Sequence, residues 1–331
     1  MKTKEVIGID LSKLTLDCYG HVSQSCCVFD NTVEGIAAMV SWALKSSKVK
    51  KQEVLFVLEH TGLYTHALMG YLSSEGYVFH VASGLAVKRS LGLTRGKSDK
   101  ADAKAIALYG YRLREELEPY QMPTQTLEAL KRLMSMRRKL VVQRAGHITT
   151  LCEQQRVLDQ QSNALLFEVQ RQIIASLDTQ ITALEDEIEY LIDQDPHLQN
   201  LYRLITSVKG IGAVTARFLL VYTAGFTRFA TWRKFACYCG IAPFPYQSGS
   251  SIRGRTKVSH LANKQAKALL SMCASSAIQH NPELKAYYQR RVEEGKNKRS
   301  ALNIVRNKLL ARVFAAVQRG TPYVNTMGFA A

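Results

Sequence analysis

Val6-Ile-Gly-Ile-Asp10 and Leu55-Phe-Val-Leu-Glu59 are two short apolar runs that each end at an acid. Runs of this length and composition are typical of strands buried on both faces of a sheet. Around them, residues 4–115 predict three strands, followed by helix, strand, helix, strand and helix. This order predicts an α/β domain whose sheet begins with antiparallel strands.

The individual elements follow from apolar spacing and from turn and cap residues. The expected strands are Glu5–Ile9, Leu14–Tyr19, Cys26–Phe29, Val54–Leu58 and Tyr77–Val81. The expected helices are Val33–Leu44, Leu63–Leu72 and Lys100–Leu113, the last of them capped by Ser98 or Asp99.

The middle of the chain has a different pattern, with almost no Gly or Pro between residues 124 and 194. Two long helices, 124–157 and 162–193, are predicted there. The second has a heptad seam formed by Ile174, Leu177, Ile181, Leu184, Ile188 and Leu191. We favour a coiled-coil arm that joins protomers, because the pattern is long and uncapped. The alternative is a pair of amphipathic helices packed on their own domain.

The last part of the chain, residues 199–325, is again helical apart from an irregular segment rich in Gly, Ser and Pro from Gly240 to Gly254. Three regions result: an α/β domain at 1–120, oligomerisation helices at 121–196 and a mainly helical domain at 197–331. The fold class is therefore α/β plus α.

The charge of the chain is strongly positive and uneven. Among 331 residues, 44 Lys and Arg face 27 Asp and Glu, and residues 248–320 hold 15 basic and 3 acidic residues. This balance argues against a neutral metabolic enzyme and favours nucleic acid over a membrane as the partner. No apolar run is long enough for a membrane span. The seven Cys residues form no disulfide or zinc pattern, as expected for reduced thiols in a cytoplasm.

Four acids form the first candidate site. Asp10 and Glu59 end neighbouring strands, and Asp99 and Asp102 share one face at the start of a helix. Such acids can converge on Mg²⁺ or Mn²⁺, which prefer hard oxygen ligands, and two metals would assist phosphoryl transfer. Each acid taken alone is equally typical of a strand end or a helix cap, but together they favour a metal site.

Two further motifs allow a purely structural interpretation. Lys209-Gly-Ile-Gly212 between helices exposes backbone N–H groups to a phosphate, with Lys209, Gly210 and Gly212 as contacts, or is simply a tight turn. Ser248-Gly-Ser-Ser-Ile-Arg-Gly-Arg-Thr-Lys257 places serines beside Arg253, Arg255 and Lys257. The residues alone favour a phosphate-contacting loop without chemistry over a nucleophilic serine.

Further basic residues extend this expected nucleic-acid surface. They lie at the start of one predicted helix and in the run that precedes the last helix, where few acids balance them. The residues are Lys264, Arg290, Arg291, Lys296, Lys298 and Arg299.

Taken in order, these blocks resemble the DEDD transposases of insertion sequences. The first three are Gly8-Ile-Asp10-x-Ser-Lys13, Glu59-His-Thr-Gly-x-Tyr64 and Ser98-Asp-Lys-Ala-Asp-Ala103. The later ones are Gly210-Ile-Gly212, Phe235-Ala-x-x-x-Gly-Ile-Ala-Pro243, Ser248-Gly-x-Ser-x-Arg-Gly254 and Ser259-x-x-x-Asn263. The resemblance is to the serine-dependent, bridge-RNA-guided recombinases related to Piv-type DNA invertases. Cys237, Cys239 and His260 depart from the blocks without touching a catalytic position.

The resemblance implies specific roles. The first domain would have the RuvC-like ribonuclease H fold, with Asp10, Glu59, Asp99 and Asp102 as a tetrad that binds Mg²⁺ or Mn²⁺. Ser248, directly before Gly249, would be the nucleophile that forms a phosphoserine link to DNA. The partners would be donor and target double-stranded DNA, a structured noncoding guide RNA, and further copies of the chain in a dimer or tetramer, in the bacterial cytoplasm at the nucleoid.

Two other functions remain open at this point. A RuvC-like endonuclease or junction resolvase would use the tetrad to activate water, so that Ser248 would be dispensable. A non-catalytic RNA- or DNA-binding protein would not need the tetrad, and the presence of all four acids argues against it.

Overall fold

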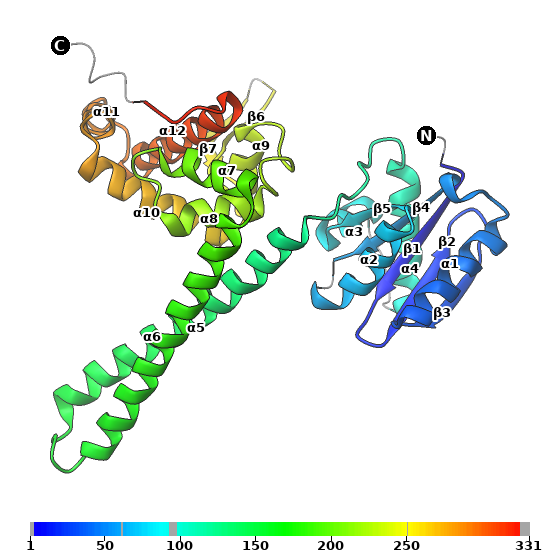
Figure 1. Ribbon diagram of the computed structural model, residues 1–331. Coiled ribbons are helices and arrows are strands. Elements are labelled where there is room, and N and C mark those ends of the chain that lie inside the picture. Colours follow the sequence, from blue (N-terminus) through cyan, green and yellow to red (C-terminus); the bar gives the residue numbers. More distant parts are fainter. Residues whose placement is uncertain (1–2, 61, 93–97, 250, 325–331) are drawn as a thin grey trace. The chain divides into compact units, whose positions relative to one another are not determined.

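The structure is a computed structural model that describes residues 3–60, 62–92, 98–249 and 251–324. It divides into two compact units, Met1–Met122 and Pro123–Ala331, here called unit 1 and unit 2 (Figure 1). Each unit is described by itself.

Unit 1 is built on a five-stranded sheet with the order β3-β2-β1-β4-β5. β1 pairs antiparallel with β2, and β2 with β3, whereas β4 and β5 run parallel to β1. This order and these directions are those of the ribonuclease H fold that the family resemblance implies. The strands are β1 (Glu5–Leu11), β2 (Thr15–Gly20), β3 (Cys26–Asp30), β4 (Val54–Glu59) and β5 (Val78–Ala82).

The helices of unit 1 begin at caps that the sequence supplies. The side chains of Thr32, Ser83 and Ser98 each accept a hydrogen bond from a backbone N–H in the first turn of α1, α3 and α4. The elements are α1 (Val33–Ser47), the 3₁₀ turns η1 (Lys51–Glu53) and η2 (Gly62–Thr65), α2 (His66–Ser74), α3 (Gly84–Leu91) and α4 (Asp99–Leu113).

All five predicted strands of unit 1 are confirmed to within two residues at either end, because alternation and turn residues mark them well. Two helical predictions differ. The expected helix Leu63–Leu72 begins as the 3₁₀ turn η2 and becomes α-helical only at His66. The short helix α3 was not predicted, because its eight residues are too few to establish a helical period from the sequence.

The sheet buries both of its faces, as the two apolar runs predict. Ile7, Ile9 and Phe56 belong to a core cluster with α1 and α2, whereas Val6 and Val57 belong to a second cluster with α3 and α4. Successive side chains of a strand point to opposite faces, so β1 and β4 are apolar throughout. Only the ends of these strands are left for polar side chains.

Unit 2 consists of eight helices and one two-stranded ribbon among its described residues. Its helices are α5 (Gln125–Val157), α6 (Ala164–Asp193), α7 (Pro196–Thr206), α8 (Ala213–Tyr222), α9 (Trp232–Tyr238), α10 (Lys264–His280), α11 (Pro282–Glu293) and α12 (Lys298–Arg319). The ribbon strands are β6 (Pro243–Ser248) and β7 (Ile252–Val258), which pair antiparallel. The segment expected to be irregular is therefore largely a ribbon; the prediction was wrong because its Gly, Pro and Ser residues mask the strand pattern.

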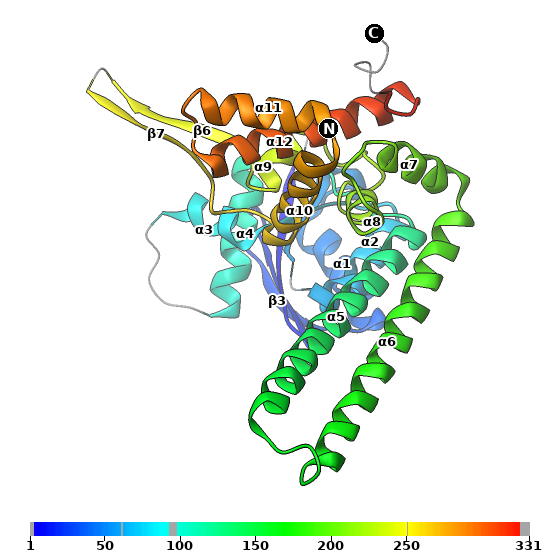
Figure 2. The ribbon, with the colours of Figure 1, turned by 90° about the vertical axis from the view of Figure 1, so that its left-hand side faces the viewer.

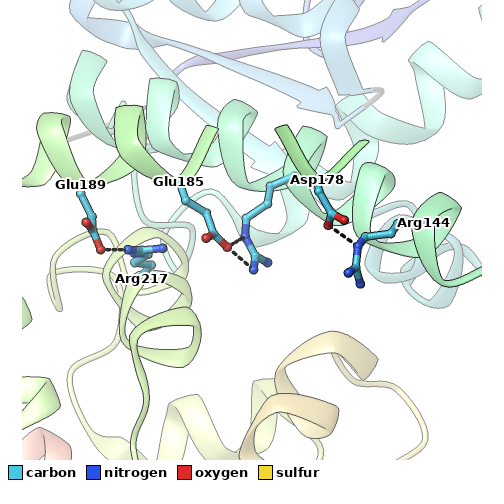
Figure 3. Close-up of polar contacts among 6 residues, drawn as sticks. Arg144, Asp178, Glu185, Glu189 and Arg217 are labelled. Atoms are coloured by element: carbon cyan, nitrogen blue, oxygen red, sulfur yellow. Dashed lines mark hydrogen bonds and ion pairs between the residues drawn. The ribbon is translucent and has the colours of Figure 1, made fainter. Parts of the chain in front are cut away.

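The two long helices lie side by side over most of their length (Figures 1 and 2). Arg137 and Arg144 on α5 form ion pairs with Glu185 and Asp178 on α6, and Arg217 on α8 pairs with Glu189 at the base (Figure 3). The α5–α6 pair thus carries interhelical charges along its length as well as apolar contacts.

The heptad seam of α6 is used at least partly within one chain. Its base residue Ile188 is fully buried in a core cluster that also contains Leu127 and Leu130 of α5 and Leu309 of α12. Farther out, Ile181 and Leu184 are half-buried. The base of the α5–α6 pair therefore shares one core with the remaining helices of unit 2.

The helices and the cysteines agree with what the sequence indicates about membrane spans and disulfides. In the described ranges, no helix combines the length and the apolar character that crossing a membrane requires. All seven cysteines have free thiols, and Cys18, Cys239 and Cys273 are buried.

Candidate active site and nucleic-acid interface

Asp10 and Glu59 lie at the same edge of the unit 1 sheet. β1 and β4 are parallel neighbours, and Ile9 pairs with Leu58, so the next residue on each strand is an acid. Parallel strands carry their carboxyl ends to one edge, which places these two side chains in the same region. The antiparallel neighbour β2 adds Asp17, which lies directly opposite Asp10.

Helix α4 brings the other two acids to this edge because it crosses β1 at very close range. A Cβ atom on Gly8 would lie 2.3 Å from both the carbonyl oxygen of Ala103 and the backbone nitrogen of Ala107. Only glycine allows this approach. Asp99 and Asp102 occupy the first turn of α4, immediately before Ala103, and so lie near Asp10 two residues beyond Gly8.

The electrostatics of Asp10 confirm that the acids influence one another. The pKa of Asp10 is raised to about 6, first by burial and then by the charges of Asp102, Asp99, Glu59 and Asp17 in that order of size. The pKa of Asp17 is also raised, first by burial and then by Asp99. Each of the four predicted acids therefore belongs to one cluster, together with Asp17, which the sequence analysis missed.

The acids suit a hard cation by chemistry, although they are not gathered into a finished metal site. Within the described ranges, no three His, Cys, Asp or Glu side chains stand close enough to share a metal ion. Like-charged carboxylates reduce their repulsion by separating. Their donor set of carboxylate oxygens is the one that Mg²⁺ and Mn²⁺ prefer, so Asp10, Glu59, Asp99 and Asp102 fit such an ion.

The start of α3 also lies at this cluster. A Cβ atom on Gly84 would be 2.1 Å from Oε1 of Glu59. Gly84 therefore leaves the space that the Glu59 carboxylate occupies. Sequence reasoning missed this residue because α3 is only eight residues long, although the Ser83-Gly84 pair directly after β5 is a typical helix start.

Ser248 lies in unit 2, at the exposed end of β6. It pairs with Ile252 across the ribbon, and Gly249 follows with a positive φ of 55°. All residues of β6 are exposed, and the ribbon projects from the helices of unit 2 (Figure 2). The neighbouring Ser251 is exposed as well, whereas Ser250 lies outside the described residues.

The ribbon does not hold its three predicted cations as one group. Directly paired residues share a face, and alternate residues of β6 do so too. Tyr246 and Ser248 thus share one face, with Lys257 brought to it by a bulge between Phe244 and Tyr246. Arg253 pairs with Gln247 on the opposite face, while Arg255 lies at the bulge. Of the three cations, only Lys257 therefore shares the face of Ser248, and it does so across the bulge.

The base of the ribbon is held firmly from both sides. Asn263 Nδ2 donates to the hydroxyl oxygen of Tyr238 at 2.9 Å, and its backbone N–H donates to the Tyr238 carbonyl. Gly240 has a positive φ of 65°, and a Cβ there would lie 2.4 Å from the Cβ of Ala262. The amides of Asn303 and Asn307 both donate to the Ile241 carbonyl oxygen, at 2.8 and 3.0 Å.

The turn Lys209–Gly212 joins α7 and α8. One of its glycines is explained by tight packing, whereas the other is open to a phosphate. Gly210 has a φ of 104° and faces Ala277 of α10 so closely that a Cβ would lie 2.9 Å from the alanine Cβ. Its role is therefore explained by packing and backbone conformation. Gly212 is exposed with open space around it, and Lys209 is exposed, so these two positions remain accessible to a phosphate.

The predicted cations between the start of α10 and the start of α12 differ in whether an acid of the chain pairs with them. Arg290 and Arg291 both form ion pairs with Glu294, which offsets part of their charge. Both also lie over the Tyr287 ring, as does Lys308, whose Nζ is 4.2 Å from the ring centroid. The other four predicted contacts are exposed; they are Lys264, Lys296, Lys298 and Arg299.

Comparison with known proteins finds two families that match parts of this chain. A transposase family defined by the DEDD domain of IS110 elements matches residues 7–161, and the Transposase IS116/IS110/IS902 family matches residues 202–289. The first range contains the four acids and the second contains Ser248. Over these two ranges the chain is similar to transposases of IS110 elements. It is therefore an enzyme of DNA recombination and transposition.

Two curated relatives of this transposase match nearly the whole chain, and a third matches under half of it. The pilin gene-inverting proteins of Moraxella bovis and Moraxella lacunata are each 27% identical to it over 327 residues, which is 97% of this chain and 98% of theirs. The insertion element IS110 uncharacterized 43.6 kDa protein of Streptomyces coelicolor is 31% identical over 46% of this chain and 37% of its own length.

One solved structure is similar to part of the transposase. It is T. thermophilus RuvC in complex with a Holliday junction substrate, which aligns with 35% of this chain and 99% of its own at 16% identity and a TM-score of 0.28. The assignment of the ribonuclease H fold depends on the strand order and directions described above.

Proposed function

We propose that this transposase cuts and rejoins DNA through Ser248, assisted by a divalent metal held by Asp10, Glu59, Asp99 and Asp102. The observation that carries the proposal is the cluster of acids around Asp10, whose charges raise the pKa of its carboxyl group. Mg²⁺ or Mn²⁺ bound there would supply charge stabilisation at the scissile phosphate. The resemblance of the ribbon sequence to the serine block of the family supports Ser248 as the nucleophile.

In this mechanism Ser248 Oγ attacks the phosphorus of a DNA phosphodiester. The Oγ–P bond forms and the P–O3′ bond breaks, while the serine hydroxyl loses its proton and the 3′ oxygen gains one. The ester keeps the energy of the broken bond, so a 3′-hydroxyl of another strand can reverse the step and reseal the backbone. The mechanism requires the acids of unit 1 and the serine of unit 2 to act on the same phosphate.

A guide RNA that pairs with donor and target DNA completes the proposal. The excess of 15 basic over 3 acidic residues in 248–320 supports a large polyanionic partner. Noncoding DNA beside the gene would encode the RNA, with loops complementary to the ends of the element.

The proposal is tested with a nicked suicide substrate that traps the first step. We expect full-length protein, guide RNA and Mg²⁺ to yield a protein–DNA adduct that resists denaturation, and peptide mapping to locate it at Ser248. DNA cut without any adduct would instead favour a resolvase that uses water as the nucleophile.

DNA affinity is expected to fall steeply with salt because of the basic residues of unit 2. Neutralising Arg253, Arg255 and Lys257 to Gln should reduce the slope of log K against log[salt] by about 2.7, at about 0.9 per phosphate contact. Fluorescence anisotropy with labelled duplex DNA measures this slope.

A matched control removes the same charge elsewhere. Lys45, Lys48 and Lys50 are exposed in unit 1, and their replacement by Gln should leave the slope close to that of the wild type. An equal change in both triple variants would show that net charge alone, rather than the ribbon, governs binding.

We also propose that the outer part of the α5–α6 pair joins protomers. Ile188 is unsuitable for testing this, because it lies in the core of its own chain and an Asp there would unfold the protein. Leu165, Val169 and Ile173 are better placed, since they recur every four residues on α6 and are 77%, 44% and 38% exposed.

Replacing Leu165, Val169 and Ile173 with Asp should convert the oligomer into a folded monomer, because three charges would be buried in the contact. Light scattering measures the mass. The control triple, Gln172, Ser176 and Gln180 to Asp, has the same spacing on exposed polar positions and should keep the wild-type mass. An unchanged mass in the apolar triple would place the protomer contact elsewhere.

A further inference from the structure

Arg306 on α12 is a half-buried cation that has no acidic partner among the described residues. Its Nε is buried and has no hydrogen-bond partner, and no carboxylate of the described residues lies within ion-pair distance of it. Burial lowers the pKa of Arg306, as expected for a charge that nothing compensates. Partial burial of an unpaired charge is costly, so a partner from outside the chain is indicated.

Other arginines of unit 2 show the contrast. Arg217, Arg291 and Arg312 also have one buried nitrogen without a hydrogen bond. Each of them, however, forms an ion pair with a glutamate: Glu189, Glu294 and Glu283 respectively. Incomplete hydrogen bonding is therefore shared by all four arginines, whereas the missing acid distinguishes Arg306.

The position of Arg306 connects it to the ribbon. Its Nη1 donates to Oδ1 of Asn303 at 3.2 Å, and Nδ2 of the same asparagine donates to the Ile241 carbonyl oxygen at 2.8 Å. Ile241 lies two residues before β6 begins. One amide group thus links the guanidinium to the base of the ribbon.

The surroundings of Arg306 on its helix are basic rather than acidic. Arg299, Asn303 and Arg306 follow one another at spacings of four and three residues, so they share one face of α12. Arg299 is exposed, whereas Val305 and Leu309, on the adjoining side of the helix, pack into the core. An anion that reaches this face from outside would meet two guanidinium groups.

We propose that Arg306 binds a backbone phosphate of duplex DNA at the base of the β6–β7 ribbon, and that Asn303 transmits this contact to the ribbon as a positioning residue. The ligand class follows from the activity of the family on DNA. A phosphate supplies the negative charge that the described part of the chain does not, and guanidinium–phosphate hydrogen bonds are among the strongest available. The proposal does not depend on Ser248 being the nucleophile.

The test compares Arg306→Gln with Arg312→Gln in the full-length protein. Both variants remove one positive charge from α12. Arg306→Gln should weaken binding of labelled duplex DNA at least tenfold and reduce the salt slope by about 0.9, because one phosphate contact is lost. Its melting temperature should stay the same or rise, because no internal ion pair is broken.

Arg312→Gln should give the reverse pattern. It leaves the largely buried Glu283 without its partner, so the melting temperature should fall while DNA affinity changes little. Equal losses of affinity in both variants would reduce the effect to net charge and overturn the proposal. Wild-type DNA affinity in Arg306→Gln would overturn it as well.

Two further measurements make the result specific. Arg306→Lys keeps the charge but not the planar fork, so it should retain the salt slope and recover only part of the affinity; this variant also serves if Arg306→Gln fails to fold. Binding of a double-stranded RNA of the same sequence is measured in parallel. A loss of affinity confined to RNA would overturn the assignment to DNA. Hydrogen exchange of residues 243–258 should show DNA-dependent protection in the wild type and less in Asn303→Ala.

Discussion

Ser248→Ala is expected to abolish both the covalent protein–DNA adduct and recombination, with a loss of about a thousandfold or more. The substitution removes the attacking oxygen without changing charge, and residue 248 is exposed at the end of β6, so the fold should be unaffected. DNA affinity should stay close to that of the wild type. A denaturing gel with the suicide substrate measures the adduct. Formation of recombined DNA junctions measures recombination.

Neighbouring residues provide the controls for this prediction. Ser251→Ala and Ser250→Ala should retain the adduct, because the family block places the nucleophile directly before Gly249. Ser248→Cys keeps a nucleophile but presents sulfur, a poor ligand for Mg²⁺, and should show little activity. Cleavage by Ser248→Ala would support the resolvase mechanism, whereas an adduct mapped to Ser250 or Ser251 would keep the mechanism and change the residue.

Asp10→Asn and Asp102→Asn should each lower the recombination rate by several orders of magnitude, because each removes one carboxylate from the proposed metal site. Isothermal titration with Mg²⁺ or Mn²⁺ should show binding to the wild type and its loss in both variants. Wild-type recombination by either variant would disprove the metal-site assignment.

The same substitution at Asp10 should stabilise the metal-free fold at neutral pH. The folded-state pKa of Asp10 is raised to about 6 from 3.8, so its ionised form destabilises the folded state above that pH. Because Asp10 is half-exposed, solvent screening reduces the expected gain in the free energy of unfolding to about 1 kcal/mol for Asp10→Asn. The gain should shrink as the pH falls through 6 and disappear below 3.8, where the wild-type carboxyl group is protonated in both states.

Thermal unfolding in chelator at pH 7.5 and pH 4 measures this difference. Asp30→Asn is the matched control, since Asp30 ends β3 as an exposed acid that is not among the charges acting on Asp10. It should leave both stability and recombination unchanged. A lower melting temperature for Asp10→Asn at pH 7.5 would mean that Asp10 contributes to the fold rather than to the site alone.

The fold of unit 1 could be predicted from the sequence because its strands are marked by local signals. Apolar runs ended by Asp10 and Glu59, and turn residues around Gly20, set the strands without tertiary information. The ribbon could not be predicted, because Pro243 and the glycines around Ser248 oppose strand propensity, and only cross-strand pairing makes β6 and β7 form.

The candidate site shows the same division. Sequence position predicts the four acids, because strand ends and a helix start converge in any sheet of this type. It does not predict Asp17, which becomes relevant only through its pairing opposite Asp10. Nor does it predict Arg306 or Asn303, because the absence of an acid near a buried cation is a property of packing and not of spacing.

The ion pairs of α5 and α6 fix the alignment of the two helices in a way that also permits changes of length. Seven residues separate Arg137 from Arg144 along α5, and the same number separates Glu185 from Asp178 back along α6, so both pairs define one antiparallel register. Inserting seven residues between the pairs in both helices would preserve this register and lengthen the α5–α6 pair by about 10 Å, at 1.5 Å per residue. An insertion in one helix alone would misalign the charges. The reach of these helices can therefore vary in whole heptads among related sequences, without alteration of either the acid cluster or the ribbon.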